Sequence, residues 1–173
     1  MKKLLLSFPL MLCMMFMGFG HALAEDITTT FTAGSGYAEG MTLSCEEGGL
    51  TWTSSGKPNA YDNQNGRGIQ FSKTSSDIVT TVSGTVSKVV VIASSNATGN
   101  TIAVSVGGNA YGEVKPINKS NNESYEFTSD SPASGEVKVS VVSAGDTGKS
   151  IYVKSITLTV ETGEDPGTGG EDP

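Results

Sequence analysis

The chain has 173 residues, enough for one domain of ordinary size. It carries 11 basic and 18 acidic residues, for a net charge of −7, with one histidine and two cysteines. Because nothing in this acidic composition forms a basic face for phosphates, it disfavours nucleic-acid binding.

The first residues have the pattern of a secretory signal peptide. A cationic head at residues 1–3 precedes the apolar run Leu4–Phe19, and Ala22 and Ala24 place small residues where signal peptidase reads them. We expect a signal peptide over residues 1–24, with cleavage before Glu25 and export to the cell surface or the medium. A retained membrane anchor is the alternative, which the short apolar run disfavours because a span needs about 20 residues.

Cleavage would limit the chemistry of the mature chain. His21 and Cys13 would leave with the signal, so Cys45 would be the remaining cysteine and no histidine would remain. Ser-His-Asp or Cys-His catalysis, an ordinary zinc site and an intramolecular disulfide are then excluded. Glu46 and Glu47 are adjacent and would point to opposite faces of a strand, so they cannot act as a catalytic pair. We therefore expect no catalytic residues, no metal and no cofactor.

Short apolar alternations then recur along the chain, separated by segments rich in Gly, Ser and Asn. Alternation with period two and an excess of β-branched residues indicate strands, and no helical stripe is present. Turns are expected at Ser83-Gly84 and at Ser131–Gly135. The predicted strand segments are 27–32, 41–46, 50–53, 68–72, 77–82, 89–93, 101–106, 124–129, 136–142 and 151–160.

Three of these segments carry more detail. Val89–Ala93 is continuously apolar, which indicates a strand covered on both faces or one whose outer face is capped by a flanking loop. In the last strand the apolar positions change parity, which predicts a β-bulge near Lys154-Ser155. Trp52 shares its parity with Leu50 and is expected in the core, although a sugar-stacking platform is the alternative.

About nine or ten short strands without a substantial helix predict an all-β antiparallel sandwich of the jelly-roll type over residues 25–160. Residues 161–173 form an acidic Gly/Pro-rich segment in which GEDP occurs twice. Such a segment cannot bury a core and is typical of a linker or tail. We expect it to lead to a covalently linked downstream domain.

Between Ile27 and Val160 the chain resembles a class of secreted β-sandwich modules. The segments that carry the resemblance are GLTWT, GRGIQF, VSKVVVIAS, NTIAVSVGG, YEFTS, GEVKVSV and KSIYVKSITLTV. They resemble galactose-binding-like jelly rolls, the type that houses many carbohydrate-binding modules, in multidomain proteins of anaerobic gut bacteria. The resemblance implies the architecture, and a location beside catalytic or adhesive domains.

The polar loop from Ser54 to Arg67 is the best candidate site in the sequence. Sugar recognition uses amides, carboxylates and guanidinium groups to bind vicinal hydroxyls, with an aromatic face for the ring. Tyr111, flanked by glycines, is expected at an exposed loop tip as a second aromatic contact. The loop's candidate ligand-binding residues are Tyr61, Asp62, Asn63, Gln64, Asn65 and Arg67.

The composition of this loop is also typical of a loop without a ligand. Its Asp, Asn and Gly residues also build turns, and Arg67 could pair with a nearby carboxylate. An EF-type calcium loop fails, because Tyr61 and Ser72 stand where acidic ligands are required. The sequence thus predicts a non-catalytic carbohydrate-binding module, with polysaccharide or glycan as partner and no membrane span after cleavage. The alternative is a structural or adhesion spacer at the cell surface with no small ligand.

Overall fold

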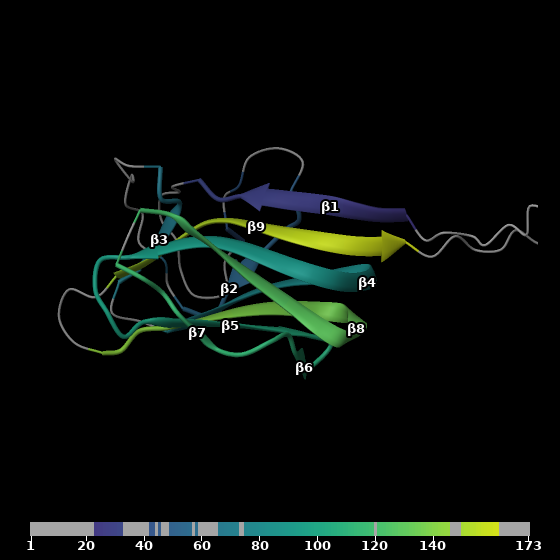
Figure 1. The fold of residues 1–173 in the computed structure, drawn as a ribbon. Coiled ribbons are helices and arrows are strands. Elements are labelled where there is room, and N and C mark those ends of the chain that lie inside the picture. Colours follow the sequence, from purple (N-terminus) through teal and green to yellow (C-terminus); the bar gives the residue numbers. More distant parts are fainter. Residues whose placement is uncertain are drawn as a thin grey trace, which may run out of the picture. The chain divides into compact units, whose positions relative to one another are not determined.

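The computed structural model describes residues 23–32, 42–43, 45, 49–56, 58, 66–72, 75–119, 121–145 and 150–162. Within them all regular structure is β, which confirms the predicted fold class, and no helix there could span a membrane. Every strand pairing is antiparallel (Figure 1). The nine strands are β1 (Leu23–Thr30), β2 (Thr53–Ser54), β3 (Ile69–Ser72), β4 (Ser76–Ser95), β5 (Thr101–Val106), β6 (Asn109–Ala110), β7 (Lys115–Pro116), β8 (Glu123–Val142) and β9 (Ser150–Thr162).

These strands form one continuous sheet that folds back into two layers, because β4 and β8 each take part in both. The first half of β4 pairs with β2 and with the second half of β8, which also pairs with β5. The second half of β4 pairs with β9 and with the first half of β8. Strands β1 and β3 pair in turn with β9 along its outer edge (Figure 1).

The inner faces of both layers share one hydrophobic core. Alternate residues of β5 and β8 are buried, and so are alternate residues of β9 on either side of its bulge. Ile69 and Phe71 are buried, as the alternation in GIQFS predicts. Trp52 is 1% exposed, so the prediction of a core tryptophan is confirmed. It packs edge-on against Phe31, and its indole Nε1 donates to Thr29 Oγ1 at 3.0 Å.

The two predicted turns at Ser83-Gly84 and Ser131–Gly135 are wrong, since β4 and β8 run through them. The register between the strands shifts there, and only Val86 and Ala133 pair within the disturbed stretch. A side chain on Gly84 would collide with Val160, and Gly135 has φ +105°. Glycine and proline residues here therefore permit a bend that carries both strands from one layer to the other.

The predicted bulge in the last strand is confirmed. Ile92 pairs with Ser155 and Ala93 with Val153, which leaves Lys154 as the extra residue. The Lys154 carbonyl accepts a hydrogen bond from the Phe31 N–H at 2.8 Å, just beyond the end of β1. Buried positions change parity at this residue, as the sequence predicts.

Strand Val89–Ala93 is covered on one face and half-covered on the other. Val89, Val91 and Ala93 are fully buried, whereas Val90 and Ile92 are partly exposed. Cys45 is half-buried and forms an isolated β-bridge with Phe31, outside the nine strands, and the strand expected over residues 41–46 stays a prediction. The run of apolar residues therefore reflects an inner core face together with a partly shielded outer face.

Strand β1 begins before the expected residue 27, and β9 ends after the expected residue 160. Leu23 pairs with Thr162, and Ala24 pairs with Glu161. Cleavage before Glu25 stays a prediction, and it would remove these two pairs from an otherwise long ladder.

Candidate functional site

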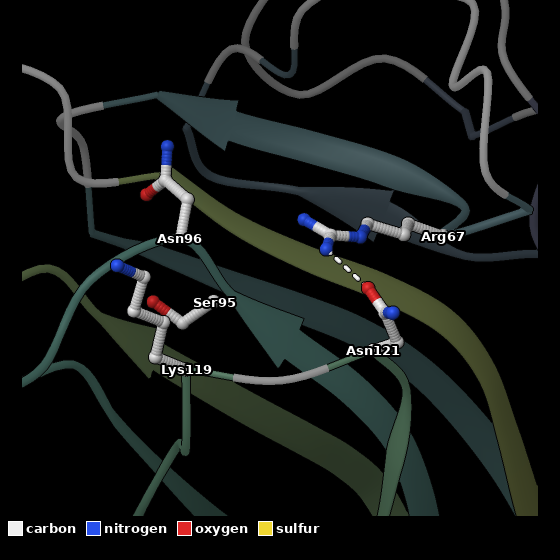
Figure 2. A pocket seen from close by; sticks show the side chains of 5 residues that line it. All are labelled: Arg67, Ser95, Asn96, Lys119 and Asn121. Atoms are coloured by element: carbon white, nitrogen blue, oxygen red, sulfur yellow. Dashed lines mark hydrogen bonds between the residues drawn. The ribbon is translucent and has the colours of Figure 1, made fainter.

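A polar pocket of about 290 Å³ lies where three distant parts of the chain meet. Arg67 precedes β3, Ser95 and Asn96 stand at the end of β4, and Lys119 and Asn121 belong to the connection between β7 and β8. Figure 2 shows Arg67 and Lys119 on opposite sides of this space. The lining therefore combines two cationic side chains, two amides and one hydroxyl.

Arg67 is positioned by its neighbours in the chain and in space. Gly68 follows it with φ +83°, and a Cβ at that position would overlap the Val153 carbonyl oxygen. The guanidinium donates from Nη2 to Asn121 Oδ1 at 2.5 Å (Figure 2). Its Cζ also lies 5.1 Å from the centroid of the Tyr152 ring, a cation–π arrangement. The cation–π contact and the hydrogen bond together hold the guanidinium in place.

The two residues at the end of β4 differ in their roles. The Ser95 hydroxyl is buried and accepts from Ala97 N–H and from Asn100 Nδ2, so it holds the turn. Asn96 is exposed, and its Oδ1 accepts from the Ser150 N–H at 2.6 Å. This bond fixes the carboxamide of Asn96 and leaves its Nδ2 group outside the hydrogen bonds among the described residues. Asn96 thus presents a donor at the pocket.

The segment that carries Lys119 and Asn121 is anchored on both sides. On one side the Ile117 N–H donates to Asn100 O at 2.8 Å, and the Ile117 side chain is buried. On the other side Asn122 adopts φ 45°, and its Nδ2 donates to Gly66 O at 3.0 Å. The latter bond ties this segment to the end of the polar loop that precedes Arg67.

A small network next to this segment contains the one clear pKa shift among the described residues. The Tyr125 hydroxyl accepts from the Asn118 N–H at 2.9 Å and donates to Glu123 Oε2 at 3.2 Å. Burial raises the pKa of Tyr125, the bond from Asn118 opposes that shift, and the charge of Glu123 adds to it. The phenol therefore stays protonated at neutral pH, and its hydroxyl links Asn118 to Glu123 through hydrogen bonds.

The structure brings Arg67, out of the residues nominated from the sequence, into this pocket. Residues 61–65 lie outside the described residues, so their predicted role stays a prediction. The expected exposure of Tyr111 is wrong, because its side chain is 0% exposed. Its hydroxyl donates to Val86 O at 2.6 Å and accepts from the Ala133 N–H at 2.7 Å, so it serves the bend in β4 and β8.

Sequence reasoning missed Asn96, Lys119, Asn121 and Tyr152. The alternation in IYVKS places Tyr152 on the outer face, and this signal was available. The Asn- and Lys-rich stretch before β8 was visible too, but nothing local links it to Arg67, which lies more than 50 residues earlier. Such a link requires the pairing order of the strands.

Outside this pocket, the described residues form no second cluster of side chains suited to binding or catalysis. A second hollow of about 150 Å³ is lined by serines, Asp77, Val141 and Val142. The carboxylate of Asp77 accepts from the Ser140 hydroxyl at 2.6 Å, so it is engaged in the fold. Among the described residues no three metal-ligating side chains gather.

No protein-family model matches the chain, and no curated protein matches its sequence. Several solved structures are similar to it. A family 36 carbohydrate-binding domain of a multidomain xylanase from the hindgut metagenome of Trinervitermes trinervoides is 10% identical, with a TM-score of 0.42 over 78% of this chain and 96% of its own. A mutant family 29 carbohydrate-binding module complexed with mannohexaose is 12% identical, with a TM-score of 0.42 over 79% of this chain and 92% of its own.

A family two carbohydrate esterase from Cellvibrio japonicus is 15% identical, with a TM-score of 0.46 over 79% of this chain. The match spans 34% of the esterase, so it concerns about a third of that protein. These similarities concern the β-fold, and they assign no residue of this chain a role.

Proposed function

We propose that this chain is a non-catalytic binding module for a carbohydrate, exported by its signal peptide and placed at the N-terminus of a larger protein. The observation that carries the proposal is the pocket lined by Arg67, which lies over the Tyr152 ring, together with Lys119 and the amides of Asn96 and Asn121. Donors of this kind suit the hydroxyl and ring oxygens of a sugar. The pocket volume lies near the lower end of the roughly 300–1,000 Å³ typical of small-ligand sites.

The anchoring of the pocket supports binding by a preformed site. Asn122 and Asn121 hold Gly66 and Arg67, and Asn96 is held by Ser150. Side chains that are fixed before the ligand arrives lose less conformational entropy on binding. The absence of histidine after His21 supports recognition over catalysis.

Isothermal titration of the full chain against a panel of neutral and acidic oligosaccharides tests the proposal. The double variant Lys119→Ala/Asn121→Ala should weaken binding at least about tenfold, equivalent to about 1.4 kcal/mol, because it removes two exposed lining groups. The control Lys88→Ala/Asn109→Ala removes the same two residue types outside the pocket and should bind like the wild type.

Failure of every oligosaccharide in the panel to bind would contradict the proposal. It would favour a structural or adhesion spacer, in which the bonds among Arg67, Asn121 and Asn96 serve only to fasten the loops. Equal losses of affinity in both double variants would also contradict a site at this pocket.

A further inference from the structure

The charge of the pocket is opposite to the charge of the chain. The whole chain has a net charge of −7, and removal of the signal would leave nine basic residues against 18 acidic ones. Yet the described lining contains two of those nine cations and no carboxylate. From this contrast we infer that the site takes a carboxylate-bearing saccharide, that is, a uronate unit. The inference rests on the proposed function and specifies its ligand.

Arg67 has the geometry for a carboxylate. Its guanidinium is planar and offers several N–H donors in a fixed fork, which matches the two oxygens of a carboxylate. The Tyr152 ring 5.1 Å from its Cζ and the bond to Asn121 Oδ1 hold the plane of that fork. Because the Asn121 oxygen accepts a hydrogen bond from Nη2, the amide also sets how the guanidinium is turned toward the pocket (Figure 2).

Lys119 supplies a second positive charge at the same place. Its side chain is exposed, and it forms no hydrogen bond or ion pair with the described residues. By contrast, Lys115 nearby donates to Glu126 O at 2.6 Å and lies over the Phe127 ring. A lysine with no partner among the described residues, facing an arginine across a pocket, favours a ligand that supplies the negative charge.

Within the described chain, the two cations that line the pocket are the charged groups nearest to a ligand seated in it. Exposed charges are screened beyond about 8 Å at physiological ionic strength. Glu123 lies outside the lining and accepts a hydrogen bond from Asn118 Nδ2 at 2.7 Å, whereas Arg67 and Lys119 line the pocket itself. Binding should weaken as salt is added, since part of the attraction is between charges on the surface.

A paired titration tests the ligand class. The probes are oligosaccharides of galacturonate, glucuronate and mannuronate, each compared with its own methyl ester, which keeps the sugar and removes the charge. At low salt, at least one uronate should bind the full chain about tenfold more tightly than its ester, and added salt should reduce the difference. Lys119→Gln should reduce uronate affinity about fivefold and ester affinity far less, whereas the matched Lys88→Gln should change neither.

The outcomes separate this inference from the proposed function. If neutral sugars or esters bind as tightly as the uronates, and Lys119→Ala/Asn121→Ala abolishes that binding, the binding function stands and the uronate assignment is overturned. A sulfated oligosaccharide that binds more tightly than every uronate would also overturn the carboxylate assignment. If no saccharide binds at all, both proposals fail.

Discussion

The hydroxyl of Tyr111 sits at the point where the two longest strands change layer. Val86 and Ala133 form the single pair between the two register shifts of β4 and β8, and the Tyr111 hydroxyl bonds to a backbone group of each. Its own N–H donates to Val104 O at 2.9 Å. One phenol thus hydrogen-bonds to a backbone group of each strand at the point where the ladder is interrupted.

Tyr111→Phe should therefore lower the free energy of unfolding by about 1–3 kcal/mol, because it removes the hydrogen bonds to the Val86 carbonyl and from the Ala133 N–H at the bend. Urea denaturation measures this change, and saccharide affinity should stay at the wild-type value. Tyr152→Phe is the comparison, since the Tyr152 hydroxyl accepts a longer bond of 3.3 Å from Gln70 and is less buried. A Tyr111→Phe variant that loses affinity while keeping its stability would refute the core role.

At the residue scale, the sequence predicts burial where it depends on the alternation of neighbouring residues in one strand. Trp52 was placed in the core because it alternates with Leu50, and the structure agrees. Tyr111 was misplaced because its glycine neighbours are typical of a loop tip, whereas its burial depends on β4 and β8, which are distant in sequence. Arg67 could be nominated from its polar loop, but its contacts with Asn121 and Tyr152 could not.

At the scale of elements, the bulge at Lys154 organises the edge of one layer. β1 pairs with β9 on one side of it and β3 on the other. Gly68 lies against it, and a Cβ there would be 2.5 Å from Lys154 Cα. The bulge therefore determines where the chain enters β3, and with it the position of the neighbouring Arg67.

Gly68→Ala should lower the free energy of unfolding by about 3 kcal/mol or more, because strain at positive φ adds to a collision with backbone. Gly66→Ala is the matched control, with φ +63° and no atom within 4 Å of the added Cβ. It should cost only about 1–2 kcal/mol, the penalty of the left-handed conformation. Thermal and urea denaturation check both, and equal losses would show that Gly68 does not pack against the bulge.

The bulge could be predicted because the apolar positions change parity within a single strand, so no partner strand is needed to detect it. At Ser83-Gly84 and Ser131–Gly135 the sequence predicts reversals where the strands bend, because glycine, serine and proline favour both structures. Whether such residues reverse a chain or bend it depends on whether two partners continue alongside, as β4 and β8 do here. Single-strand patterns carry no information about that partner.

At the scale of the whole described module, β4 and β8 make the two layers dependent on each other. Each strand has 20 residues and contributes to both layers. The layers also share one core, which extends from Trp52 and Phe31 to Val106 and Tyr111. Separation of the two layers would break the pairing of β4 with β8 or expose the core that both layers share.

Unfolding of the full chain should therefore occur in one cooperative transition. The fluorescence of Trp52, the single tryptophan, and the far-UV circular dichroism of the strands should give the same urea midpoint and slope. Tyr111→Phe should shift both curves together. Separate midpoints would show that the layers unfold independently, contrary to the shared strands.

The class of fold was accessible from the sequence, since repeated short alternations without a helical stripe leave few architectures. The pocket was only partly accessible, because it combines residues 67, 95–96 and 119–121, which meet only after the sheet has formed. Local patterns cannot encode that convergence, whereas strand pairing produces it.

Strand β9 also sets the distance between the pocket and the end of the described chain. Tyr152 lies under Arg67 near its beginning, and Thr162 ends it ten residues later. At about 3.3 Å per residue, these positions are roughly 30 Å apart. A tether attached at Thr162 would therefore leave the pocket accessible, so immobilising the protein through that end presents the site to long polysaccharides in solution.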